Sequence, residues 1–171
     1  MIRHTMKGHK VLIVVLLSIM ATWTLFGSQL VFATTELYSV ELDGQQEVPI
    51  VQTTANGTAE LSVPHISPIT YSLNVSGLDR VTAAHIHNGT PGENGPIVAT
   101  LFKADQPTGP IDGILAQGNI TDANLEGPMQ GKSTDGLATA MIEGQTYINV
   151  HTQQNPNGEI RGQITSGGGA Q

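Results

Sequence analysis

Ala83-Ala84-His85-Ile86-His87-Asn88-Gly89 is the stretch from which the fold of this chain can be built outward. Apolar and polar residues alternate along it, which is typical of a strand with one buried face. Residues i and i+2 of a strand point to the same side. The two histidines therefore share one face of the strand, while Ala84 and Ile86 share the other. We expect the aliphatic face to point into a core and the histidine face to point outward.

A second stretch, Tyr147-Ile148-Asn149-Val150-His151-Thr152, repeats this pattern far downstream. Ile148 and Val150 share one face, and Asn149 and His151 share the other. If both aliphatic faces enter one core, His151 meets the two earlier histidines on one wall of a sheet. Three converging imidazoles suit copper, with zinc as the competing metal. Asn149 would then orient one of the ligands through a hydrogen bond.

Two other interpretations of the three histidines remain open. They could hydrogen-bond the loops at residues 89–96 and 153–158 and so hold two turns in place. They could also act in catalysis, because imidazole changes protonation near neutral pH. If they do bind a metal, we expect protons to compete for the rings at roughly pH 6–7. His65 lies in a turn between two prolines, and we expect it at the surface.

Six further stretches alternate in the same way or form compact apolar runs, and Gly and Pro separate them. They are residues 37–42, 57–63, 69–75, 97–102, 114–120 and 159–164. One short helix is expected over residues 137–142, capped by Thr134 or Asp135 and stopped by Gly144. About eight short strands with little helix predict an all-β fold, as an antiparallel β-sandwich or flattened barrel.

The first 33 residues differ from the rest of the chain. Residues 1–10 are basic, and residues 11–32 are mostly apolar and carry no charge. The run ends in Val31-Phe32-Ala33, so we expect a signal peptide cleaved before Thr34 or a retained membrane anchor. Either one implies a secreted or cell-surface protein. Residues 34–165 then form one domain, and residues 166–171 form a flexible tail.

The charge and the composition exclude several classes of function. Without residues 1–33 the chain keeps four Lys and Arg and all fourteen Asp and Glu, a net charge of −10 with histidine neutral. That charge argues against nucleic acid as a partner and suits a surface that attracts cations. The chain has no cysteine, so no disulfide stabilises it. No phosphate-binding loop, nucleophile elbow or paired catalytic carboxylate stands out.

Five motifs, in order, resemble the chordin-type (CHRD) domain family. They are Gly44–Pro49 (GQQEVP), Ala83–Gly89 (AAHIHNG), Asn94–Ile97 (NGPI), Tyr147–Thr152 (YINVHT) and Asn155–Gln163 (NPNGEIRGQ). The resemblance covers roughly residues 37–165. It implies an extracellular domain, because such domains occur in an extracellular antagonist of growth factors and in exported microbial proteins of one domain. It implies no particular activity.

A weaker resemblance links the chain to copper-zinc superoxide dismutase, a family of Greek-key β-sandwiches. The shared order is a His-x-His strand, a Gly-rich loop, a late strand that ends in His, and a Gly-x-x-Arg segment. The resemblance implies that His85, His87 and His151 occupy copper-ligand positions and that Arg161 lies near an arginine that guides the anion. No histidine lies between His87 and His151, and the family's disulfide cysteines are absent. These departures argue against dismutase activity and leave a site for one copper ion.

Other polar residues have both a functional and a structural interpretation. Glu159 and Arg161 share a strand face, so Arg161 either steers anions toward a metal or forms an ion pair with Glu159, which we favour. Glu47 lies in a loop, where it accepts backbone hydrogen bonds or faces solvent. N-glycosylation sequons, which also arise by chance, begin at Asn56, Asn74, Asn88 and Asn119.

These observations predict an exported CHRD-type domain that is not an enzyme and that binds copper through the three histidines, to buffer, store or deliver the metal. One alternative is an extracellular module that binds a protein or a glycan, in which the histidines only support loops. Another is a copper-dependent redox enzyme that acts on superoxide. Stoichiometric metal binding distinguishes the first from the second, and turnover by the copper-loaded protein would identify the third.

Overall fold

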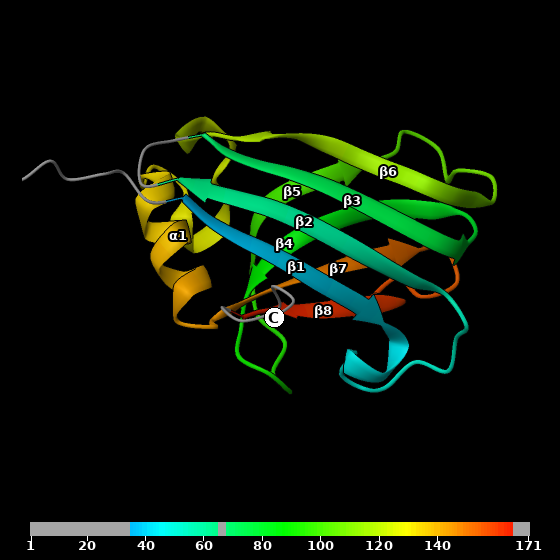
Figure 1. The fold of residues 1–171 in the computed structure, drawn as a ribbon. Coiled ribbons are helices and arrows are strands. Elements are labelled where there is room, and N and C mark those ends of the chain that lie inside the picture. The colour runs from blue at the N-terminus through cyan, green and yellow to red at the C-terminus, as the bar shows by residue number, and fades with distance from the viewer. Residues whose placement is uncertain (1–34, 65–67, 166–171) are drawn as a thin grey trace, which may run out of the picture. The chain divides into compact units, whose positions relative to one another are not determined.

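The computed structural model describes residues 35–64 and 68–165, and it contains all eight expected strands (Figure 1). The strands are β1 (Thr35–Asp43), β2 (Asn56–Pro64), β3 (Ile69–Leu78), β4 (Val81–Asn88), β5 (Ile97–Lys103), β6 (Ile111–Ile120), β7 (Thr146–Thr152) and β8 (Ile160–Ile164). The helical elements are α1 (Thr134–Ile142) and three 3₁₀ turns, η1 (Gly44–Gln46), η2 (Asp122–Asn124) and η3 (Gly127–Met129).

Three of the sequence-based expectations fall on residues that the structure does not describe. They are the signal peptide or anchor at residues 1–33, the tail at residues 166–171, and the surface position of His65. Among the described residues, no helix has the length and apolar character needed to cross a membrane.

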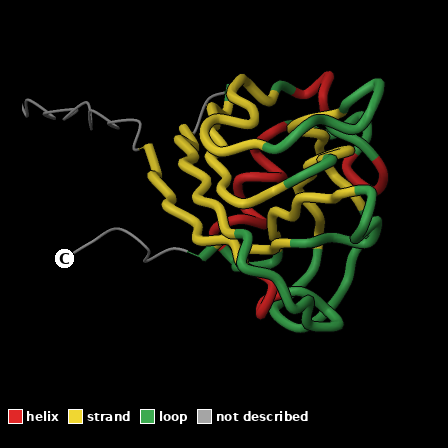
Figure 2. The backbone as a smooth tube through the Cα atoms, turned by 90° about the vertical axis from the view of Figure 1, so that its right-hand side faces the viewer, coloured by secondary structure: helices red, strands yellow, loops and turns green. Residues whose placement is uncertain are grey.

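All strands pair antiparallel in a single sheet, in the order β5-β4-β7-β8-β1-β2-β3-β6. The sheet curls so that β1, β2, β3 and β6 form one layer and β4, β5, β7 and β8 form the other (Figures 1 and 2). The last strand, β8, lies between β7 and the first strand, β1. The neighbours β3 and β6, and likewise β4 and β7, are not consecutive in the chain, and these crossovers are the Greek-key connections. A hydrogen bond of 2.7 Å from the Tyr71 hydroxyl to the Leu101 carbonyl joins β3 to β5. The predicted antiparallel sandwich or flattened barrel is therefore confirmed.

The core contains the aliphatic faces that the alternation predicted. Ala84 and Ile86 of β4 and Ile148 and Val150 of β7 are each 0% exposed. Burying an aliphatic side chain of the size of Val or Ile contributes about 1.5–3 kcal/mol relative to leaving it in water. The two strands pair directly, with Ile86 opposite Ile148, so their other faces also meet. This pairing fixes where the histidines lie.

The short helix starts slightly earlier than predicted. Its N-cap position is Ser133, which has an extended backbone, and Thr134 is already helical. Thr134 is buried, and its backbone N–H donates to Asp122 Oδ1 at 2.8 Å. This tertiary hydrogen bond satisfies an N–H of the first helical turn, so the helix begins at Thr134. The prediction that Thr134 or Asp135 caps the helix was wrong. The expected stop is present, because Gly144 has φ +67° just after the last turn.

Candidate metal centre

Three histidine side chains from β4 and β7 converge on one wall of the sheet. The ring centroids of His85 and His151 lie 4.9 Å apart, those of His85 and His87 5.7 Å apart, and those of His87 and His151 6.0 Å apart. One ring nitrogen of each histidine lies within 4.8 Å of those of the other two. The pairing of β4 with β7 brings His151 opposite Ala83, two residues from His85. The predicted cluster is therefore present.

Two of the three rings are held by loop carbonyls. Nδ1 of His87 lies 2.8 Å from the carbonyl oxygen of Gly95, and Nδ1 of His151 lies 3.0 Å from that of Pro156. A carbonyl oxygen only accepts, so Nδ1 carries the proton in each neutral ring and Nε2 keeps its lone pair. Holding the loops and binding a metal are therefore compatible roles, because the same hydrogen bonds orient the free nitrogens.

One nitrogen of each of the three rings has no hydrogen-bond partner within residues 35–64 and 68–165. These nitrogens are Nδ1 of His85 and Nε2 of both His87 and His151, and all three are buried. A buried polar atom left unpaired costs about 1–3 kcal/mol. Three buried ring nitrogens with no partner among the described residues fit a cation, and an all-imidazole set suits copper or zinc. The three histidines could therefore hold a metal ion.

Burial keeps these rings in the neutral form that binds metals. It lowers the pKa of His85 to about 4, and the neighbouring His151 and His87 add to this effect. Burial also lowers the pKa of His87 and the pKa of His151. Protons therefore compete for these nitrogens at a lower pH than the range of roughly 6–7 expected from an ordinary imidazole.

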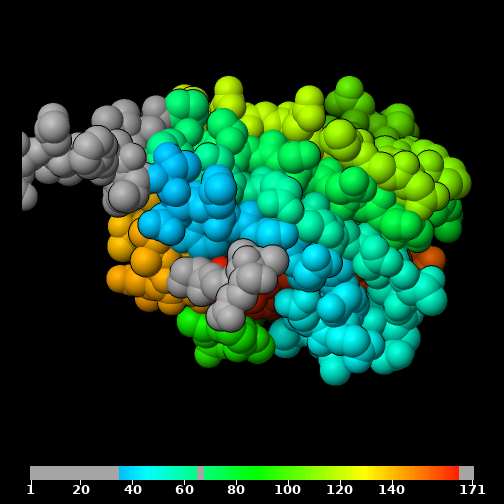
Figure 3. Space-filling model, viewed as in Figure 1, coloured from blue at the N-terminus to red at the C-terminus, as the bar shows by residue number. Residues whose placement is uncertain are grey.

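The histidine face is covered, although the sequence predicted that it points outward. It does face away from the core, yet Tyr147, Asn149 and Arg161 on this face are each at most 2% exposed. The loops at residues 89–96 and 153–158 fold over it, and so does the segment at residues 44–51, shown in cyan at the lower right of Figure 3. A hydrogen bond of 2.7 Å from Asn94 Nδ2 to the Val48 carbonyl joins the loop at residues 89–96 to the segment at residues 44–51.

Arg161 reaches this covered space from β8. Its guanidinium carbon lies 3.5 Å from the centroid of the Tyr147 ring, and that ring stacks on His87. Its Nη1 donates to Asn94 Oδ1 at 3.3 Å, and its Nη2 donates to the Thr90 carbonyl at 3.1 Å. In this position the side chain ties the loop at residues 89–96 to β8 and is only 1% exposed.

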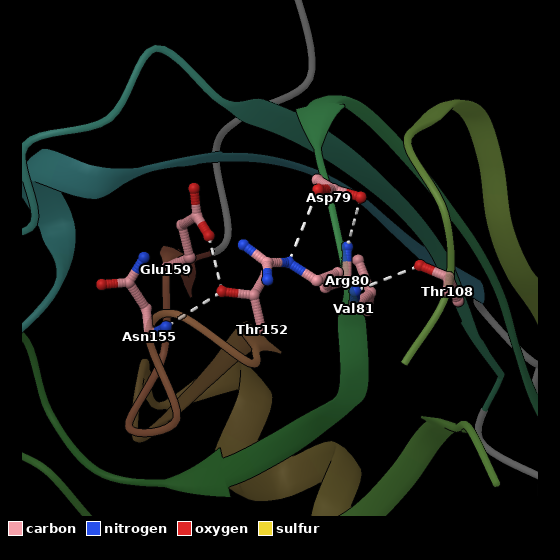
Figure 4. Close-up of polar contacts among 7 residues, drawn as sticks. All are labelled: Asp79, Arg80, Val81, Thr108, Thr152, Asn155 and Glu159. Atoms are coloured by element: carbon pink, nitrogen blue, oxygen red, sulfur yellow. Dashed lines mark hydrogen bonds and ion pairs between the residues drawn. The ribbon is translucent and has the colours of Figure 1, made fainter. Parts of the chain in front are cut away.

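Glu159 makes no ion pair with Arg161, so the favoured structural interpretation of this pair was wrong. Its carboxylate accepts hydrogen bonds from Thr53 Oγ1 at 2.9 Å and from Thr152 Oγ1 at 2.7 Å. Thr152 Oγ1 accepts in turn from the Asn155 N–H at 3.0 Å (Figure 4). Glu159 thus supports the turn whose Pro156 carbonyl orients His151.

The ion pair that the described residues do contain lies elsewhere. It joins Arg80 Nε to Asp79 Oδ2 at 3.6 Å, and both side chains are about half exposed (Figure 4). Exposed pairs of this kind contribute little to stability, at most about 1 kcal/mol.

Glu47 belongs to this site, although sequence reasoning did not place it there. Its side chain is 4% exposed, so it does not face solvent, and its Oε1 has no hydrogen-bond partner among the described residues. Burial raises the pKa of Glu47 to about 7, against the opposing effects of Arg161 and of the Val48 backbone. The signal that could have found it is its place inside the GQQEVP motif, in which it is the one ionisable residue.

The asparagines of the four sequons lie on strands. Asn56, Asn74 and Asn119 are exposed, and Asn88 at the end of β4 is half-buried.

Comparison with known proteins identifies the family. The family model of the CHRD domain matches the sequence over residues 38–164. Chordin from Xenopus laevis is 33% identical over an alignment of 137 residues that covers 75% of this chain. Chordin from Danio rerio is 32% identical over an alignment of 129 residues that covers 73% of this chain. The chain spans only 13% and 12% of the lengths of these relatives. No solved structure matches the chain significantly. The chain therefore belongs to the CHRD domain family.

Proposed function

We propose that this chain is an exported CHRD domain that binds one copper ion through His85, His87 and His151, and that it buffers, stores or delivers the metal outside the cell. The observation that carries the proposal is the convergence of the three rings, with one nitrogen of each within 4.8 Å of the others, together with a buried nitrogen on each ring that has no partner among the described residues. Imidazole suits copper and zinc better than it suits magnesium or calcium, which prefer oxygen. The Irving–Williams order favours copper over zinc at equal availability.

The surroundings of the cluster support this use. The Gly95 and Pro156 carbonyls orient two rings and leave their Nε2 atoms free, which is the usual support for a metal-binding histidine. The net charge of −10 beyond residue 33 attracts cations. The basic and then apolar character of residues 1–33 supports export.

Copper titration of the full chain, with elemental analysis, tests the proposal. We expect one tightly bound copper per chain, largely lost in His85→Ala and in His151→Ala, while circular dichroism keeps its β-sheet signal. His65→Ala is the matched control and should bind like the wild type, because the proposal assigns the metal to the other three histidines. Equal, weak binding by the wild type and by His151→Ala would show that the site does not exist.

A second candidate function is an extracellular module that binds a protein or a glycan. It is favoured by the hydrogen bonds through which His87 and His151 hold two loops over one face of the sheet. In that case His87→Ala would lower stability, and no variant would change metal content. A copper-dependent enzyme that acts on superoxide would instead show turnover once copper is loaded, which the titrated samples also test.

Export has its own test. N-terminal sequencing of the protein recovered outside the cell should begin at Thr34 if residues 1–33 are cleaved. Recovery of a cytoplasmic product that keeps Met1 would contradict export.

A further inference from the structure

We infer that Asn149 supplies an amide oxygen as a fourth ligand to the metal, and that Glu47 holds the Asn149 amide in the orientation this requires. The inference rests on the proposed function, since it adds to the three histidine ligands. The sequence alone predicted neither a ligand role for Asn149 nor any role for Glu47 at the metal.

Asn149 lies in the middle of the histidine wall. It pairs directly with His85 across β4 and β7, and it is two residues from His151 on the same face of β7. Its side chain also lies beside His87. It is 2% exposed, and its Oδ1 is buried with no hydrogen-bond partner among the described residues. Asn149 thus adds a fourth buried acceptor to the three ring nitrogens.

The orientation of the amide follows from its other neighbours. Asn149 Nδ2 donates to the Asn157 carbonyl at 3.4 Å and lies beside the Glu47 carboxyl. A methyl group at Gly158 would collide with Glu47 Oε1 and would lie 2.7 Å from Asn149 Nδ2, so both side chains converge over Gly158. The Asn157 carbonyl only accepts, and so does the Glu47 carboxyl when it is ionised, so these two groups select the amide nitrogen. The amide oxygen is therefore left for the histidine side.

The count of donors and acceptors then points to a cation. His87 Nε2, His151 Nε2 and Asn149 Oδ1 are buried acceptors, and His85 Nδ1 is a fourth when the proton of that ring is on Nε2. None of the four has a donor among the described residues. Three imidazole nitrogens and one oxygen make a four-coordinate set that copper and zinc accept. Glu47 places a carboxyl group behind the amide, where it offsets part of the charge of a buried cation.

Copper affinity and the electron paramagnetic resonance spectrum of the Cu(II)-loaded full chain test this inference. We expect Asn149→Ala to weaken copper binding by roughly 10–100-fold and to change the copper hyperfine splitting, because the oxygen ligand is lost. Asn149→Asp keeps an oxygen at the same place and adds charge, so it should tighten binding and shift the spectrum. Glu47→Gln should weaken binding by less, up to about 10-fold, because a glutamine amide no longer selects the Asn149 nitrogen.

Asn119 is an exposed asparagine on β6, so Asn119→Ala is the matched control. It should change neither the copper affinity nor the spectrum. Wild-type affinity and an unchanged spectrum in both Asn149 variants would overturn the inference and leave the three-histidine site intact. If Asn149→Ala fails to fold, Asn149→Asp decides alone, and an unchanged affinity and spectrum overturn the inference. Absence of copper binding by the wild type would overturn the proposed function and this inference together.

Discussion

The ring of Tyr147 lies nearly parallel to the ring of His87, at an interplanar angle of 8° and a centroid separation of 4.9 Å. The Arg161 guanidinium packs on the same tyrosine. The Tyr147 hydroxyl accepts the N–H of Gly95 at 3.2 Å, and the Gly95 carbonyl holds His87. One aromatic side chain thus joins β8 and a covering loop to the histidine cluster.

Replacing Tyr147 should separate these contributions. Tyr147→Phe keeps the ring and removes the acceptor of the Gly95 N–H, so we expect the free energy of unfolding to fall by about 1–2 kcal/mol. Tyr147→Leu also removes the stack on His87 and the contact with Arg161, so we expect a loss of about 2–4 kcal/mol. Urea denaturation followed by circular dichroism measures both. Equal losses would mean that the ring contacts contribute nothing.

The metal-free protein should lose stability as the pH falls from about 6.5 to about 4. Burial lowers the pKa of His85 to about 4 and also lowers those of His87 and His151, whereas unfolded histidine titrates near 6.5. Below pH 6.5 the unfolded chain binds more protons than the folded one, so unfolding becomes easier until the folded rings also protonate. Urea denaturation at pH 7.5, 5.5 and 4 tests this, and His85→Gln should flatten the profile. A wild-type profile as flat as that of His85→Gln would contradict the burial of this ring.

Glu47 should make the metal-free protein less stable as the pH rises, whereas the histidines make it less stable as the pH falls. Burial raises its pKa from 4.5 to about 7, so its contribution is fully present below pH 4.5 and is lost as the pH rises through 7. Glutamine carries no charge, so Glu47→Gln should stabilise the metal-free protein at pH 8, on the order of 1–3 kcal/mol, and have little effect at pH 4. Chemical denaturation at the two pH values measures the difference. An equal effect at both would show that Glu47 titrates alike in the folded and unfolded chain.

Gly158→Ala should destabilise the protein more than Gly113→Ala. Both glycines have φ +130°, so alanine strains the backbone at either position, by about 1–3 kcal/mol. A Cβ at residue 113 meets nothing within 4 Å, whereas one at residue 158 collides with Glu47 Oε1. We therefore expect a further loss of roughly 1–3 kcal/mol for Gly158→Ala alone in thermal or urea unfolding. Equal losses would place Glu47 away from Gly158.

The sequence by itself determined the strands and their buried faces. Alternation with a period of two reports which side of a strand is apolar, so Ala84, Ile86, Ile148 and Val150 were predicted in the core and are found there. The same parity placed the three histidines on the opposite face. The family could also be recognised, because its motifs are short and local, as the match over residues 38–164 confirms.

Only the tertiary structure decided what covers the histidine face. Parity predicted a pair between Glu159 and Arg161, but β8 begins at Ile160, so Glu159 lies outside the strand and bonds to Thr53 and Thr152 instead. Glu47 lies over Gly158 and beside Asn149 because loops from distant parts of the chain fold over one wall. Periodicity records the local environment of a residue, whereas these burials depend on strand register and on contacts between segments far apart in sequence.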